Sequence, residues 1–222
     1  MILIHGSGGV GDNHKDWAKV LNKMGIVTFI LDSFTSRGIS EVYTGAQTIG
    51  TGSRIIDVYR AVELLRLSSE ASIAAYLAFY PPLWLDLKEF EKVDGRPIRI
   101  FVGTSDDWTP SETARIYIEK LQSAGQDAKI HEYPGAHHAF DNPSLGRTIF
   151  IRDAMNLSKC HFKETTIGGE WVDPITNETV SRQASCISRG ATVEYNAAAH
   201  RQAIKDVESF LRTVNSQPGK DR

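Results

Sequence analysis

The sequence predicts an α/β domain built on a mostly parallel sheet with helices on both faces. Short apolar runs alternate with longer segments whose apolar residues recur at helical spacing. That succession of strands and helices is typical of right-handed crossovers on a parallel sheet. The chain has 222 residues, 41% of them hydrophobic and 23% charged, which is enough for one sizeable core.

The first part of the chain supplies two strands and two helices in order. Residues 1–4 form a short apolar run that predicts a buried strand ending in a glycine-rich loop. Residues 14–24 have one apolar face and end at Gly25, as a helix does. Residues 26–31 predict a second strand, and Ser53 can cap the next helix. That helix is expected to direct these apolar side chains inward: Ile55, Ile56, Tyr59, Val62 and Leu65.

The second part continues the alternation. The expected elements are strands over 73–80, 97–102 and 129–133 and helices over 111–124 and 196–215. Residues 144–195 show no clear periodicity and contain several turn signals, so we predict an irregular excursion there rather than a second core. We therefore expect one domain over residues 1–215 and a disordered tail over 216–222.

Composition excludes several classes of protein. The net charge of −2 provides no basic excess to displace counterions from a nucleic acid. No apolar run approaches the roughly 20 residues that span a bilayer, and the first residues do not form a signal peptide. We expect a soluble protein without nucleic-acid or membrane partners; the sequence leaves open its compartment (cytoplasmic or periplasmic) and its oligomeric state.

The two cysteines, Cys160 and Cys186, both fall in the irregular region. In an oxidising compartment they could form a disulfide that stabilises the fold by about 3 kcal/mol. In a reducing compartment they would be two ordinary thiols. The spacing of a single pair leaves both alternatives open.

A glycine-rich loop follows the first strand, over residues 5–11 (HGSGGVG). Glycines let backbone N–H groups turn towards a phosphate or an oxyanion. Residues 6–11 also fit the Gly-x-Gly-x-x-Gly spacing of dinucleotide-binding loops, with Asp32 as the nearest candidate for the ribose. A plain strand-to-helix turn is the third interpretation.

Acids and histidines follow the next strands. Asp106 and Asp107 come after the strand over 97–102, and His137 and His138 occupy a Gly-Ala turn after the strand over 129–133. A histidine held at a strand end with one free ring nitrogen can act as a general base, and a carboxylate can orient it. The alternatives are a solvated turn that caps the next helix and a histidine buried for hydrogen bonding.

A metal centre is a weaker hypothesis. The candidate ligands would be His131, His137, His138 and His161. Their spacing matches no zinc pattern, and adjacent histidines point in different directions. We therefore expect neither a metal nor another cofactor.

Several motifs together resemble the dienelactone hydrolase family of the α/β-hydrolase fold. They are residues 4–9 (IHGSGG), 32–38 (DSFTSRG), 78–82 (AFYPP), 103–107 (GTSDD), 135–141 (GAHHAFD) and 189–193 (RGATV). The resemblance covers most of the chain. It implies an α/β-hydrolase-like fold and a small-molecule ester or lactone as substrate.

The resemblance also implies roles for particular residues. Asp106 occupies the position of the acid, and His138 that of the base. The loop His5, Gly6, Ser7, Gly8 would supply half of the oxyanion hole. In the family these groups serve a Ser or Cys that attacks the carbonyl carbon.

The chain departs from the family where the nucleophile belongs. The family places it on a Gly-x-Ser/Cys-x-Gly elbow before the strand at Ile73, and here only residues 68–72 (SSEAS) fill that interval. A strand, elbow and helix need far more residues. Other serines are poor substitutes: Ser7, Ser68, Ser69, Ser72 and Ser188. The chain also begins on what would be the family's third strand.

We therefore expect a hydrolase of carboxylic esters or lactones whose nucleophile is missing from this chain, or a truncated piece of one. The alternative is an inactive hydrolase-fold binding protein. The missing strand would lie in the middle of the sheet. The strands over 26–31 and 73–80 must then pair directly or leave a slot with unpaired backbone groups.

Overall fold

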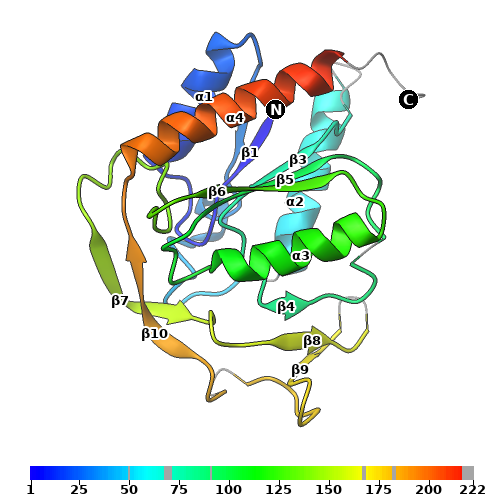
Figure 1. The fold of residues 1–222 in the computed structure, drawn as a ribbon, viewed down its shortest axis with the longest axis vertical. Coiled ribbons are helices and arrows are strands. Elements are labelled where there is room, and N and C mark those ends of the chain that lie inside the picture. Colours follow the sequence, from blue (N-terminus) through cyan, green and yellow to red (C-terminus); the bar gives the residue numbers. More distant parts are fainter. Residues whose placement is uncertain (50, 68–71, 91, 167–168, 182–183, 217–222) are drawn as a thin grey trace.

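The computed structural model describes residues 1–49, 51–67, 72–90, 92–166, 169–181 and 184–216, and it is an α/β fold (Figure 1). The helices are α1 (Asp12–Lys23), α2 (Thr51–Arg66), α3 (Ser111–Ser123) and α4 (Ala197–Ser216), with a 3-10 turn at Thr35–Arg37. The strands are β1 (Ile2–Ile4), β2 (Phe29–Leu31), β3 (Tyr76–Phe79), β4 (Leu85–Asp86), β5 (Ile98–Gly103), β6 (Ala128–Tyr133), β7 (Ile149–Asn156), β8 (Phe162–Glu164), β9 (Trp171–Val172) and β10 (Ser188–Val193).

Parallel strands form the centre of the molecule. β5 lies between β3 and β6, and all three are parallel. β5 is buried from Arg99 to Gly103 because it has a strand on each side and helices on both faces. Its sequence is accordingly a continuous apolar run broken only by Arg99, as expected for a strand without a solvent face.

Alternate residues of β5 enter different cores. Phe101 faces α1 and α4, where it meets Leu21 and Val207. Ile100 and Val102 face α3, where they pack with residues such as Ala114, Ile118 and Leu121. Figure 1 shows α4 and α3 on opposite sides of the strands. The period of two in a strand thus explains the helices on both faces.

β1 and β2 form a separate parallel pair. Among the residues that the structure describes, no ladder joins this pair to β3. Direct pairing of β2 with β3, one of the two outcomes considered from the sequence, therefore does not occur in this part of the chain. β1 and β3 are only partly buried, in contrast to β5.

The prediction for the inward face of α2 was wrong at three residues: Ile55, Ile56 and Tyr59 are 51%, 59% and 61% exposed. It is confirmed for Val62, which is buried together with Ala61. The helical periodicity is present, but the sheet offers fewer neighbours than the pattern assumes. An amphipathic helix buries its apolar stripe only where another element covers it.

The segment 144–195 is more regular than its sequence suggests. It holds an antiparallel pair of β7 and β10, and β8 and β9, which extend β4 into a second small sheet. Apolar and polar residues do not alternate between a buried and an exposed face of β7, since Ile149 and Phe150 are both exposed. A bulge at Gly190 (φ +103°) also shifts the register of the pair.

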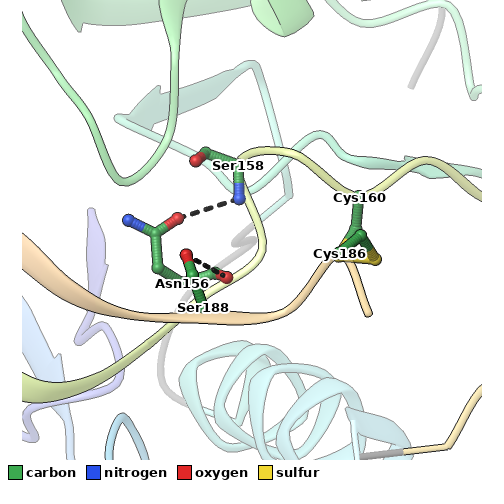
Figure 2. Close-up of a disulfide and its surroundings, with 5 residues drawn as sticks. All are labelled: Asn156, Ser158, Cys160, Cys186 and Ser188. Atoms are coloured by element: carbon green, nitrogen blue, oxygen red, sulfur yellow. Dashed lines mark hydrogen bonds between the residues drawn. A yellow bond between two sulfur atoms is a disulfide. The ribbon is translucent and has the colours of Figure 1, made fainter. Parts of the chain in front are cut away.

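A disulfide joins Cys160 and Cys186 and closes this excursion (Figure 2). Beside it, the side chain of Asn156 accepts a hydrogen bond from Ser158 N (2.9 Å). The Asn156 amide also donates to the carbonyl oxygens of Asp107 (3.0 Å) and Gly190 (2.8 Å). The excursion is therefore attached to the loop that follows β5.

The ends of the chain differ slightly from expectation. α1 begins at Asp12, two residues earlier than predicted, because Gly11 serves as its N-cap. Ser216, expected in the tail, is the last residue of α4, and residues 217–222 lie outside the described residues. No helix in the described ranges is both long and apolar enough to cross a membrane.

Candidate active site

Asp106 lies in the turn between β5 and α3 and is 6% exposed. Its Oδ1 accepts hydrogen bonds from the backbone N–H groups of Trp108 (2.9 Å) and Thr109 (2.8 Å), and its Oδ2 accepts one from the Thr109 hydroxyl (2.8 Å). Burial raises the pKa of Asp106, but hydrogen bonds and charge from His138 and Thr109 outweigh it and lower the pKa overall. The carboxylate is thus fixed and ionised.

His138 lies directly beside this carboxylate. Its Nδ1 is 3.0 Å from Asp106 Oδ2 and 3.0 Å from the Thr109 hydroxyl oxygen. An ionised carboxylate only accepts, so the proton is on Nδ1. None of the hydrogen bonds among the described residues ends on Nε2 of His138, so its lone pair is available to take a proton.

Two aromatic rings hold the imidazole in place. The ring centres of Tyr80 and Trp108 lie 4.4 Å and 4.8 Å from that of His138. Tyr80 has φ +38°, an uncommon value for a residue with a side chain. Its hydroxyl donates to Asp141 Oδ1 (2.9 Å), and Asp141 Oδ2 accepts from Trp17 Nε1 (2.7 Å). The buried Asp141 therefore anchors one wall of the site.

The histidine turn is fastened to β5 and β10. Ser105 N donates to Ala136 O (3.0 Å), and Glu194 N donates to His138 O (3.1 Å). A Cβ on Gly103 would lie 2.0 Å from Ala136 O, so only glycine permits this approach. Backbone contacts thus set the position of His138 relative to Asp106.

Asp107 and His137, which are adjacent in sequence to Asp106 and His138, interact with other residues. Asp107 accepts hydrogen bonds from the backbone N–H (2.8 Å) and hydroxyl (2.7 Å) of Thr192, so it anchors β10. His137 Nε2 lies 3.8 Å from Glu194. Neither acid caps α3, whose N-cap is Pro110, so the predicted capping role was wrong.

The loop after β1 is an open backbone turn. His5 is 1% exposed; its Nε2 accepts from Ser33 N (3.1 Å) and its Nδ1 contacts Gly6 O (2.8 Å), so the ring supports the loop. Gly6 pairs with Gly9 in an isolated antiparallel bridge. Within the described part, no hydrogen bond uses the backbone N–H of Ser7 or Gly8, so these two N–H groups can bind an oxyanion.

The loop leads into the same site from the other side. Asn13, one residue into α1, contributes a hydrogen bond to the Tyr80 hydroxyl, whose pKa is raised well above its ordinary value by burial and by Asp141. The charge of Asp141 also reaches His14. The carboxyl ends of β1 and β3 therefore lie at the same end of the sheet.

Asp32 is engaged within its own turn. Oδ1 accepts from the backbone N–H groups of Phe34 (2.9 Å) and Thr35 (3.0 Å), and Oδ2 accepts from the Thr35 hydroxyl. Hydrogen bonds from Thr35 and Phe34 lower the pKa of Asp32 to about 2. The geometry favours a structural role over the ribose contact considered from the sequence.

The candidate nucleophiles are poorly placed. Val193 of β10 bridges to His138, and Ser188 lies five residues earlier along the strand, roughly 17 Å away at about 3.4 Å per residue. Its hydroxyl contacts Asn156 O instead (Figure 2). Ser72 is exposed, and Ser68 and Ser69 lie outside the described residues.

The described residues contain no group of three or more potential metal ligands. His131 lies 3.6 Å from Asp206, and burial lowers its pKa. His137 and His138 have separate carboxylate partners. The structure thus does not bring together the histidines considered for a metal.

Thr109, Tyr80, Trp108 and Asp141 were not singled out from the sequence. Asp106 and Thr109 are three residues apart, the spacing of a carboxylate that accepts from a backbone N–H three residues on, so this pair could have been found. Tyr80 and Asp141 are far apart in the chain, and no local pattern predicts their contact.

Fold and site together define a class: an α/β fold with a hydrogen-bonded Asp–His pair at the carboxyl ends of parallel strands, as in α/β-hydrolases. The model of the dienelactone hydrolase family matches residues 61–215. The chain belongs to the dienelactone hydrolase family. The α/β-hydrolase-like fold and the family predicted from the sequence are confirmed, and the family is one of hydrolases.

A solved structure shows a similar fold. A dienelactone hydrolase-like promiscuous phosphotriesterase from metagenomic libraries has a TM-score of 0.53 and 13% identity, covering 96% of this chain and 85% of that chain. The esterase PE8 has a TM-score of 0.46 and 17% identity, covering 63% and 84%. No curated protein sequence matches this chain.

Proposed function

We propose that the chain carries the acid–base half of a site that hydrolyses carboxylic esters or lactones. The observation that carries this proposal is the bond of 3.0 Å between His138 Nδ1 and Asp106 Oδ2, with no hydrogen bond from a described residue on Nε2. Membership of a hydrolase family supports it independently. The substrate is a small molecule.

The proposed chemistry needs both ring nitrogens of His138. Nε2 takes the proton of an attacking hydroxyl or thiol group. At the same time the oxygen or sulfur of that group forms a bond to the carbonyl carbon. Asp106 stabilises the imidazolium that forms. His138 then returns the proton to the leaving alkoxide. The N–H groups of Ser7 and Gly8 would hold the oxyanion.

We further propose that the nucleophile is missing from this chain. The short interval between Leu67 and Ile73 and the distance of Ser188 from His138 support this. Ester hydrolysis by the chain should therefore be close to the uncatalysed rate.

A small added alcohol tests the base separately from the nucleophile. We expect the chain to accelerate acetyl transfer from p-nitrophenyl acetate to trifluoroethanol, roughly a hundredfold or more, because His138 can deprotonate the alcohol. His138→Ala should abolish the acceleration, and His137→Ala, the matched control, should retain it. Equal rates for the chain and His138→Ala would contradict a functional base.

The alternative function is ligand binding without turnover. It is favoured by a cavity of about 390 Å³ beside the loop after β1, lined by Ile4, Val42, Ile49, Arg54, Ile55 and Val58. A small ester that raises the melting temperature and is neither hydrolysed nor transferred to trifluoroethanol would support this alternative.

A further inference from the structure

Thr109 donates a hydrogen bond to each oxygen of the Asp106 carboxylate. Its backbone N–H donates to Oδ1 (2.8 Å), and its hydroxyl donates to Oδ2 (2.8 Å). Two hydrogen bonds from one residue fix the plane of a carboxylate, whereas a single bond would leave the group free to rotate. The hydroxyl thereby helps to determine where Oδ2 lies, and Oδ2 is the oxygen that contacts His138.

The same hydroxyl lies against the imidazole of His138. Its oxygen is 3.0 Å from Nδ1, and Nδ1 is 3.0 Å from Asp106 Oδ2. The three atoms form a nearly equilateral triangle that contains two protons, one on the hydroxyl and one on Nδ1. Since the hydroxyl proton points to the carboxylate, a lone pair of its oxygen can accept from Nδ1. The Nδ1 proton therefore has two acceptors, the carboxylate and the Thr109 oxygen.

The chain leaves Thr109 little freedom to move from this position. The residue is 6% exposed, so water competes weakly for its hydroxyl. It precedes Pro110, the N-cap of α3, and a residue before proline is restricted to extended conformations. Its β-branched side chain is also stiff at χ1. The turn thus orients the hydroxyl before any substrate binds.

We propose that Thr109 is a positioning residue of the candidate site. Its hydroxyl holds Asp106 Oδ2 and the Nδ1 proton of His138 together, which keeps the lone pair on Nε2. Thr109 takes no part in bond making: its proton stays on its oxygen while the proton of the attacking group goes to Nε2. The inference deepens the proposed function and rests on it, because the position of the imidazole matters to the reaction only if His138 acts as the base.

Thr109→Val is the direct test, because valine keeps the β-branched shape and removes the hydroxyl. Acetyl transfer from p-nitrophenyl acetate to trifluoroethanol should fall roughly tenfold, the factor that one hydrogen bond to a charged group contributes. Thr109→Ser restores the hydroxyl and should return the rate to within about twofold of the wild type. Where the wild-type chain accelerates the transfer, an equal rate for Thr109→Val would overturn the proposal.

Thr192→Val is the matched control. The Thr192 hydroxyl donates to Asp107 Oδ2 (2.7 Å), so the substitution removes a bond of the same kind from the adjacent carboxylate. It should lower the melting temperature, as Thr109→Val does, but leave the transfer rate within about twofold of the wild type. A comparable loss of rate in both variants would overturn the proposal, because it would assign the effect to a loosened fold.

The Nδ1 proton can also be followed by NMR without turnover. Its resonance, assigned by its absence in His138→Ala, should exchange with water about tenfold faster in Thr109→Val than in the wild type. Thr109→Ser and Thr192→Val should exchange as the wild type does. Equal exchange in Thr109→Val and the wild type, or no Nδ1–H resonance in the wild type, would overturn the proposal.

The two measurements separate this inference from the proposed function. Faster exchange in Thr109→Val together with no transfer by the wild-type chain would support the hold of Thr109 on the Nδ1 proton and contradict the proposed base. Transfer that His138→Ala abolishes and Thr109→Val leaves unchanged would support the base and overturn the role of Thr109.

Discussion

The carboxyl ends of β5 and β1 each lead into a loop of the candidate site, but their surroundings differ. β5 has a strand on each side, and its loop holds Asp106 with every carboxylate oxygen hydrogen-bonded. Among the described residues, β1 has a strand partner on one side only, and the backbone N–H groups of Ser7 and Gly8 in its glycine loop have no hydrogen-bond partner.

The difference shows what positions the Asp106–His138 pair. His138 is fixed because β5, β6 and β10 all contribute backbone contacts to its turn. The loop after β1 has the composition of an oxyanion loop, but β1 has no strand on its second side in the part of the chain that the structure describes. Preorganisation depends on these surrounding elements as much as on the site residues.

The largest expected contrast is in the free energy of unfolding that side chains of β5 and β1 contribute. Phe101→Ala should lower the free energy of unfolding by roughly 3–5 kcal/mol, because Phe101 is fully buried. Ile4→Ala, at 45% exposed, should cost about 1 kcal/mol or less. Urea denaturation followed by tryptophan fluorescence measures both. Equal losses would mean that the two strands are equally covered in solution.

Matched glycine substitutions compare the two loops. Gly103→Ala should cost about 3 kcal/mol, since its Cβ would meet the backbone of Ala136. Gly8→Ala should stay within about 0.5 kcal/mol, because nothing lies within 4 Å of the added carbon. The same denaturation experiment compares them. A mild Gly103→Ala would show that the histidine turn is not tightly held.

Acid should affect other regions before it reaches the Asp–His pair. Burial lowers the pKa of His14, His131 and His200 below the ordinary 6.5, so the unfolded chain binds more protons and stability falls as the pH drops below about 6.5. Because the pKa of Asp106 is lowered in the folded chain, the stability that this carboxylate contributes is lost only below about pH 3.8.

We therefore expect the melting temperature to fall by roughly 2–5 °C between pH 7 and pH 5. His200→Gln should reduce this fall, because His200 is buried, and His161→Gln, an exposed control, should not. A melting temperature that is constant from pH 7 to pH 5 would contradict the lowered histidine pKa values.

The sequence predicted the elements that follow a simple period and could not predict those that depend on missing or distant partners. The strands around β5 and the helices α1, α3 and α4 lie within a few residues of expectation. The prediction for α2 was wrong at Ile55, Ile56 and Tyr59 because burial needs a neighbour that the sequence pattern does not reveal. β7 and β10 escaped prediction because their outer residues are exposed and a bulge breaks their register.

The candidate site also contains residues that the sequence predicted and contacts that it could not predict. Asp106 and His138 were singled out because each follows a strand, and parallel strands bring their carboxyl ends together. The contacts of Tyr80 with His138 and Asp141 join segments separated by 58 and 61 residues. No local pattern specifies such contacts, which tertiary packing alone creates.

The central claim is that the chain holds an acid–base pair without a nucleophile for it to activate. Intact mass spectrometry after incubation with a fluorophosphonate probe tests this most directly, with an active serine hydrolase in the same reaction as the positive control. The account predicts that the control protein gains one probe and this chain retains its unmodified mass. A stoichiometric adduct on one serine of this chain, lost in His138→Ala, would contradict it.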